Sequence, residues 1–226
     1  MDQIKRFAVY YAPRDGAFAS RAAEWLGRDP RTGTALPQPV LPGIGDPHGI
    51  TVDPRRYGFH GTIRAPFRPA QGLDEAAIRD RVAALAAALA PVTCDGLRLE
   101  NLHGFLALTP TGCEAALLEL GARVVEGTDD LRAPLTEAEI TRRRPEHLSP
   151  RQRALLDRWG YPFVMEEFRF HLTLTDRLAD PDPVAAALET HFAPVLPRPF
   201  VIDDLCLFGE DPSGHFHLLH RYALSG

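Results

Sequence analysis

Two histidines half a chain apart, His60 and His171, each stand two residues before a threonine, Thr62 and Thr173. Residues i and i+2 of a strand point to the same face, so each motif would present an imidazole and a hydroxyl together. Histidine exchanges protons near neutral pH, because its ordinary pKa is about 6.5. One imidazole could activate an attacking oxygen while the other protonates a leaving oxygen, and the hydroxyls could hold phosphate oxygens. The spacing therefore predicts a site for metal-independent cleavage of a phosphodiester.

Two arginines are candidate phosphate-binding residues. Arg64 follows Thr62 by two residues and Arg169 precedes His171 by two, so both would share the face of the histidines if the strands continue. Arginine presents a planar fork of donors that matches phosphate oxygens. A surface salt bridge is the alternative role for either side chain.

Three tyrosines are candidates for the wall of the same pocket. Tyr57 precedes His60 by three residues. One tyrosine of the adjacent pair Tyr10 and Tyr11 is expected to face the site, and Tyr11 is taken as the candidate. A place in the hydrophobic core is the alternative for each of them.

The surrounding sequence predicts the elements that must position these side chains. Apolar alternation bounded by Pro and Gly predicts strands, and Ala- and Leu-rich stretches predict helices. The predicted strands span residues 7–12, 57–67, 93–99, 104–109, 168–175, 199–208 and 216–224. The predicted helices span residues 17–26, 74–89, 114–126, 149–159 and 183–192. Residues 29–56, rich in Pro and Gly, are predicted to form a long loop.

The two halves repeat one order of elements, strand, helix, strand, strand. The interval from His60 to His171 is the same as the interval from Phe105 to Phe216. Such a repeat predicts an α+β fold with two lobes related by a pseudo-two-fold axis, each a β-α-β-β unit with an antiparallel sheet facing a central cleft.

This organisation predicts one bilobal domain over residues 1–226. Residues 1–12 with 57–127 would form the first unit, and residues 161–226 the second. Residues 128–160 would form a linking helical insert, whose arginines are interpreted as facing solvent.

The residues around the two motifs resemble a known family. The segments 57–67 (Tyr-Gly-Phe-His-Gly-Thr-Ile-Arg-Ala-Pro-Phe) and 168–175 (Phe-Arg-Phe-His-Leu-Thr-Leu-Thr) look like the twin His-x-Thr signatures of the 2H phosphoesterase superfamily. With the opening Tyr-Tyr-Ala-Pro at 10–13, they resemble the branch associated with phosphonate-utilisation gene clusters. The resemblance implies a bilobal α+β fold that hydrolyses cyclic or 2′,5′-type phosphodiesters of a small sugar or nucleotide.

The resemblance also implies residue roles. His60 and His171 would be the catalytic pair, and Thr62 and Thr173 would bind phosphate. The chain departs from the pattern twice: glycine stands at position 61 where alanine is expected, and arginine at 64 where lysine is expected. We expect the first exchange to be harmless and the second to keep the charge.

The bulk composition limits the partners. The 226 residues carry a net charge of −5, which argues against an extended nucleic-acid ligand and leaves a small phosphodiester as the expected partner. No stretch approaches the roughly 20 apolar residues of a membrane span. The three cysteines form no pattern typical of a disulfide framework or a zinc site. These features predict a cytoplasmic protein and leave its oligomeric state open.

A second group of histidines, His215, His217 and His220, lies on the last predicted strand. A metal site with Asp211 is the functional alternative, but no acidic residue stands at a diagnostic spacing, so we predict no metal and no cofactor.

Two further functions of the protein stay open. One is an RNA-end phosphodiesterase or ligase, and the other is a phosphate-ester binding protein without turnover.

Overall fold

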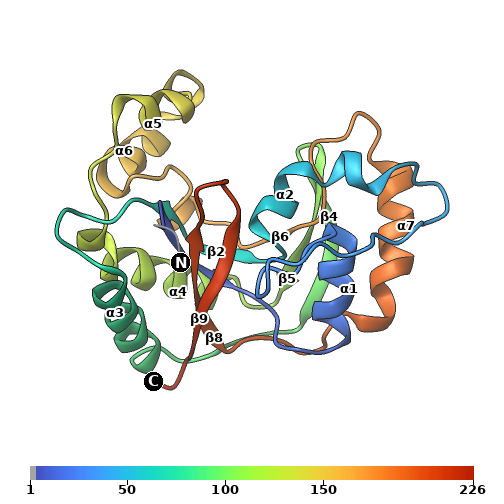
Figure 1. Ribbon diagram of the computed structural model, residues 1–226, viewed down its shortest axis with the longest axis horizontal. Coiled ribbons are helices and arrows are strands. Elements are labelled where there is room, and N and C mark those ends of the chain that lie inside the picture. Colours follow the sequence, from blue (N-terminus) through green and yellow to red (C-terminus); the bar gives the residue numbers. More distant parts are fainter. Residues whose placement is uncertain (1–3) are drawn as a thin grey trace.

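The computed structural model describes residues 4–226 as an antiparallel sheet covered by helices (Figure 1). The strands are β1 (Phe7–Tyr11), β2 (Gly61–Phe67), β3 (Val92–Cys94), β4 (Gly96–Leu102), β5 (Phe105–Thr111), β6 (Leu172–Thr173), β7 (Phe200–Ile202), β8 (Asp204–Glu210) and β9 (Phe216–Ala223). Seven of them form one sheet in the order β4-β5-β6-β2-β1-β8-β9, and β3 pairs with β7. The predicted α+β class with antiparallel strands is confirmed.

Helices account for most of the remaining chain. The α-helices are α1 (Ala17–Leu26), α2 (Val52–Tyr57), α3 (Glu75–Ala87), α4 (Glu114–Gly127), α5 (Glu137–Arg142), α6 (Pro150–Trp159) and α7 (Asp182–Phe192). Short 3₁₀ turns are η1 (Pro47–Ile50), η2 (Asp129–Leu131), η3 (Pro145–His147), η4 (Met165–Glu167) and η5 (Ala193–Val195). The sequence predicted α1 with its observed bounds, whereas it missed α2, which lies at the end of the predicted loop. None of the helices between residues 4 and 226 has the length and apolar character needed to cross a membrane.

The two repeated units exchange their hairpins. The hairpin β4–β5 of the first half pairs with β6 of the second half, while β8–β9 of the second half joins β2 through β1. Helix α3 likewise packs against β8 and β9, and α7 packs against β4. The halves meet at the centre of the sheet, where Gly61 of β2 pairs with Leu172 of β6. The pseudo-two-fold arrangement therefore runs through the two histidine motifs, and strands of both halves lie in one continuous sheet.

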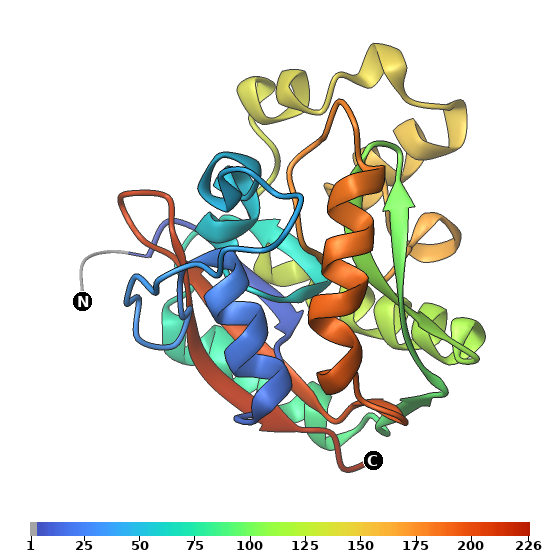
Figure 2. The ribbon, with the colours of Figure 1, turned by 90° about the vertical axis from the view of Figure 1, so that its right-hand side faces the viewer.

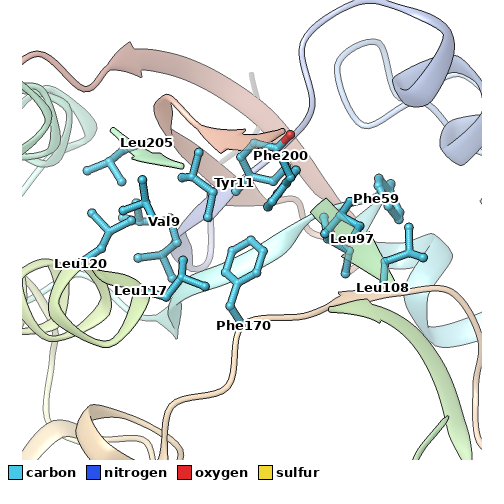
Figure 3. Close-up of a cluster of buried hydrophobic side chains, with 14 of the residues drawn as sticks. Val9, Tyr11, Phe59, Leu97, Leu108, Leu117, Leu120, Phe170, Phe200 and Leu205 are labelled. Carbon is cyan, nitrogen blue, oxygen red and sulfur yellow. The ribbon is translucent and has the colours of Figure 1, made fainter. Parts of the chain in front are cut away.

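Alternate residues of strand β1 face opposite sides of the sheet, one side with the main hydrophobic core and the other with the histidines. Phe7, Val9 and Tyr11 belong to the large core beneath the helices, and Figure 3 shows Tyr11 among those apolar side chains. Ala8 and Tyr10 belong to a smaller cluster on the opposite face. The alternation is that of a strand with both faces covered. Helices α1 and α7 lie side by side over one face of the sheet (Figure 2).

Gly61 permits the close approach of the two halves. A Cβ atom at this position would lie 2.2 Å from Cζ of Phe170, whose ring packs directly over the glycine. Glycine in place of alanine thus does no harm here, as expected, but the two residues are not interchangeable in this chain, because alanine would force the ring of Phe170 to move.

Gly61→Ala is expected to lower the free energy of unfolding by about 1–3 kcal/mol through overpacking. Gly45→Ala is the matched control, since a Cβ atom there meets nothing within 4 Å. Chemical denaturation of both variants measures the difference. Equal midpoints for Gly61→Ala and the wild type would contradict the packing argument.

Residues 128–160, predicted as a linking helical insert, contain the helices α5 and α6. Helices α5 and α6 stand apart from the sheet in Figure 1. Each begins with a capping box, at Thr136 and at Ser149, in which side chains satisfy the first backbone N–H groups. These local signals fix the start of each helix independently of the core.

The cysteines differ from the expectation. Cys94, at the end of β3, forms a disulfide with Cys113, just before α4, while Cys206 is a buried free thiol. The cysteine pattern, which is not typical of a disulfide framework, did not predict this bond, because it forms only when the fold brings together two cysteines 19 residues apart in the sequence. The cytoplasmic location stays a prediction, with weaker support, since disulfides are uncommon in reducing compartments.

Candidate active site

The two histidines occupy equivalent positions. Each stands immediately before its strand, because β2 begins at Gly61 and β6 at Leu172. The predicted strands 57–67 and 168–175 are therefore too long. His60 donates from Nδ1 to the carbonyl oxygen of Gly58 at 2.8 Å, and His171 donates from Nδ1 to the carbonyl oxygen of Arg169 at 2.8 Å. A carbonyl oxygen only accepts, so Nδ1 carries the hydrogen in each ring and Nε2 is left to exchange a proton with a substrate.

Each histidine lies across from the threonine of the other motif. Gly61 and Leu172 are direct partners in an antiparallel pair. The same register, continued by one residue in each direction, places His60 opposite Thr173 and His171 opposite Thr62. The two histidines are then diagonal neighbours, a relation that separates the residues by about 7–8 Å and keeps them within reach of long or aromatic side chains. His60 Nε2 also lies 3.2 Å from the Thr62 hydroxyl, which confirms that the two residues of this motif share a face.

Two neighbouring cavities open onto this group. The first, which we call the His60 cavity, has a volume of about 660 Å³ and is lined by His60, Thr62 and Thr173. The second, the His171 cavity, has a volume of about 480 Å³ and is lined by His171 and again by Thr62. Both are lined in addition by Ala65, Phe105 and Tyr161. The structure thus brings together all four residues of the His-x-Thr motifs.

Burial sets the protonation of both imidazoles. It lowers the pKa of His60 to about 4, an effect opposed by the hydrogen bond to Gly58 and reinforced by the charge of a protonated His171. Burial also lowers the pKa of His171 from its ordinary value. Both rings are therefore neutral at pH 7 before an anion binds, and a bound phosphate would favour their protonated forms.

The tyrosine that faces the site is Tyr10. Its ring stacks on His60 with 4.0 Å between centroids, and the ring of Tyr57 lies 5.8 Å from the same imidazole. Tyr57 therefore takes its predicted place near the site. Tyr11 does not, because it shares the core face of β1 and packs against Phe170 and Phe200. The candidate Tyr11 is corrected to Tyr10.

Arg64 lies outside both histidine cavities. The pairing of β1 with β2 slips at this point, so that Thr62 pairs with Tyr10 whereas Arg64 pairs with Val9, a core residue. The prediction that Arg64 shares the face of Thr62 is wrong, because a β-bulge interrupts the alternation. The guanidinium is buried, donates to the carbonyl oxygen of Trp159 and lies 3.7 Å from Asp129.

Other arginines surround the histidines. Arg169 is exposed and lines the His171 cavity, as predicted. Arg6, Arg143 and Arg177 line the His60 cavity and were not predicted. Arg143 comes from the insert and lies 4.7 Å over the ring of Tyr161, so the interpretation that the insert's arginines face only solvent is wrong at this position.

Asp176 links the second motif to the loop that carries the first. Its carboxylate accepts hydrogen bonds from the backbone N–H groups of Val52 and Asp53, at 2.7 and 3.0 Å. These groups lie at the N-terminus of α2, where a carboxylate satisfies free donors and the helix dipole. Since α2 ends at Tyr57, just before Gly58, this contact helps to position His60.

His215 and His217 belong to a polar network at the β8–β9 turn, whereas His220 lies 3.9 Å from Glu75. His217 bonds through Nε2 to Asp211 at 2.9 Å, and His215 Nδ1 lies 2.8 Å from the Ser213 hydroxyl. Between residues 4 and 226, no group of three or more His, Cys, Asp and Glu side chains is arranged to hold a metal ion.

Comparison with known proteins finds curated relatives that match nearly all of this chain, and solved structures with some likeness to its fold. The chain is 40% identical over its whole length to the ribose 1,5-bisphosphate phosphokinase PhnN of Janthinobacterium sp. (strain Marseille) and covers 52% of that protein. It is 35% identical, over 92% of its length, to the PhnN of Laribacter hongkongensis and covers 49% of it. The chain thus spans about half the length of these curated relatives.

The solved structures with some likeness share little sequence. TT0787 of Thermus thermophilus matches with a TM-score of 0.48 and 16% identity, over 98% of each chain. LigT of E. coli, solved with NADP⁺, matches with a TM-score of 0.41 and 11% identity, over 99% of this chain and 100% of LigT.

The site combines two histidines, each with Nδ1 held by a backbone carbonyl and each across from a threonine, where the two halves of the sheet meet. The chain belongs to the DUF1045 family, described as a protein of unknown function, whose family model matches residues 62–217.

Proposed function

We propose that the protein hydrolyses a cyclic or 2′,5′-type phosphodiester of a small sugar or nucleotide, with His60 and His171 as its acid–base pair and no metal ion. The observation that carries the proposal is the matched tautomer of the two rings, which directs both Nε2 atoms toward a substrate. Two proton-exchanging groups are what a phosphodiester needs for attack by water and departure of the alcohol.

The depressed pKa of His60 suits the role of general base. Neutral His60 would take a proton from water as the water oxygen attacks phosphorus, and His171, protonated once the anion is bound, would give its proton to the departing oxygen. The hydroxyls of Thr62 and Thr173 would donate to the non-bridging oxygens, where negative charge increases. Arg169 would add its positive charge at the mouth of the His171 cavity. The products are a phosphomonoester and a free hydroxyl.

The relatives support a setting in sugar phosphate metabolism. Both curated relatives carry the name ribose 1,5-bisphosphate phosphokinase PhnN, and this chain aligns with about half of each. We propose on this basis that the protein acts in the cytoplasm on a phosphate ester of phosphonate metabolism. An RNA-end enzyme is the weaker candidate, because the net charge of the chain is −5.

The pH dependence tests the pairing of acid and base. Activity, measured as kcat/KM on a panel of cyclic phosphodiesters, is expected to be bell-shaped. It falls as the pH drops through about 4, where free His60 becomes protonated. It falls again as the pH rises through the pKa of His171, which lies below the ordinary value of 6.5.

A strong chelator should leave this profile unchanged, and added divalent cations should not raise it. Loss of activity in the chelator would contradict the metal-free mechanism. A profile that stays flat from pH 4 to 7 would contradict the assignment of two titrating imidazoles. If no diester in the panel is cleaved, the proposed reaction is wrong even if the fold is right.

A further inference from the structure

A third cavity, of about 240 Å³, adjoins the His60 cavity beside the insert. Seven arginines line it: Arg6, Arg56, Arg64, Arg68, Arg132, Arg142 and Arg143. We call it the arginine cavity. Six residues line both it and the His60 cavity: Arg6, Tyr57, Ala65, Pro66, Arg143 and Tyr161. A ligand held at His60 could therefore extend into the arginine cavity.

The carboxylates of the described chain neutralise these arginines only in part. Four carboxylates lie within ion-pair distance of the seven: Glu210 at Arg6, Asp53 at Arg56, Glu139 at Arg68, and Asp129 at Arg64 and Arg132. Asp129 also lies 3.6 Å from Arg158, so one carboxylate serves three guanidinium groups. No ion pair is found for Arg142 or Arg143 among residues 4–226. The cavity thus keeps an excess of positive charge.

Arg64 is the most buried and least completely paired of these arginines. Its side chain is 2% exposed, yet its Nε and Nη2 atoms have no hydrogen-bond partner within residues 4–226. A buried guanidinium without full pairing costs stability, because desolvation of the charge is not offset by hydrogen bonds. Burial indeed lowers the pKa of Arg64 to about 10. An anion in the cavity would place negative charge and acceptors beside this incompletely paired guanidinium.

We propose that the arginine cavity binds a phosphomonoester on the same substrate whose diester is cleaved between His60 and His171. The substrate would then be a sugar phosphodiester that carries a second, separate phosphate. Guanidinium groups match phosphate oxygens with paired N–H donors, and several of them converge here. This inference rests on the proposed function for the diester, whereas the binding of a phosphomonoester does not require turnover.

Direct binding tests the cavity alone. Ribose 5-phosphate, which has no diester, is the probe, and calorimetry measures its affinity for the wild type and for Arg64→Met and Arg142→Ala. Each variant is expected to bind about 10- to 100-fold more weakly, the loss typical of one charge-assisted hydrogen bond. Arg98→Ala is the control, since Arg98 is exposed, pairs with Glu100 and lines none of the three cavities.

Melting temperatures distinguish a binding role from a structural one. Arg64→Met is expected to melt at or above the temperature of the wild type, because it removes an incompletely paired buried charge. Arg142 is exposed, so its variant stays folded even if Arg64→Met does not. A lower melting temperature for Arg64→Met, together with unchanged binding by Arg142→Ala, would assign Arg64 to structure and overturn the proposal.

Kinetics tests whether the bound phosphate belongs to the substrate. The probes are adenosine 2′,3′-cyclic phosphate and the same compound with a 5′-phosphate. The wild type is expected to prefer the 5′-phosphorylated diester by at least about 10-fold in kcat/KM, and the two arginine variants to lose that preference. Equal kcat/KM for both diesters would overturn the inference and leave the proposed function intact. If neither diester is cleaved while ribose 5-phosphate binds, the proposed function fails and the anion site stands.

Discussion

His60→Ala and His171→Ala are each expected to lower kcat by about 10²–10⁴-fold, because each removes one proton-transfer step from the cleavage of the diester. KM should change far less, since Thr62 and Thr173, the proposed phosphate-binding residues, would stay in place. The measurement is steady-state kinetics on the best diester of the panel. His147→Ala is the matched control, because His147 is exposed and lines none of the three cavities.

The double variant tests whether the two histidines act in the same step. If the two rings act in one concerted step, His60→Ala with His171→Ala should lose little more than either single change, as residues that work as a unit are strongly non-additive. Full additivity would indicate two independent contributions. Unchanged turnover in either single variant would leave a binding protein without catalysis as the remaining explanation.

Local patterns predicted much of this site. The spacing of each His-x-Thr motif identified all four central residues, because side chains two apart on an extended segment share a face where no bulge intervenes. Helix α6 was predicted from Ser149-Pro150 at its start and Gly160 at its end, and these signals act within one turn of the chain. Such features depend on neighbours in sequence and can be recognised there.

The wrong predictions concern residues whose positions depend on contacts with distant parts of the chain. Arg64 does not lie on the face of the histidines, because the pairing of β2 with β1 shifts register. Pro66 signals an irregularity in a central strand, but it does not fix the residue at which the register shifts. The disulfide between Cys94 and Cys113 needs β3 and the start of α4 to meet. Arg143 reaches the site from an insert whose position depends on tertiary contacts.

The choice between Tyr10 and Tyr11 could have been made from the sequence. Phe7, Val9 and Tyr11 are large residues that alternate with the small Ala8, so the bulky face of β1 could be recognised as the core face. Tyr10 then falls on the other face, together with His60. The alternation of large and small residues along β1 was visible in the sequence, but the face with the large residues was not recognised as the core face.

Thr62→Val and Thr173→Val are expected to lower kcat by about 10²–10³-fold each, the loss found when one donor to a developing oxyanion is removed. Valine keeps the shape of threonine and its preference for strands, so the fold should tolerate both changes. Thr62 lines both histidine cavities and lies 3.2 Å from His60 Nε2, whereas Thr173 lines only the His60 cavity. Thr62→Val should therefore cost more than Thr173→Val.

Serine variants separate the hydroxyl from the packing of the side chain. Thr62→Ser and Thr173→Ser keep a donor in place and should recover most of the turnover that the valine variants lose. Thr93→Val, an exposed position on β3, is the control for the exchange itself. The comparison is made in kcat rather than KM, because a donor that bonds more strongly as charge develops acts on the transition state. Equal kcat for Thr62→Val and Thr62→Ser would show that the hydroxyl makes no such bond, and the phosphate would then have to be held by the surrounding arginines alone.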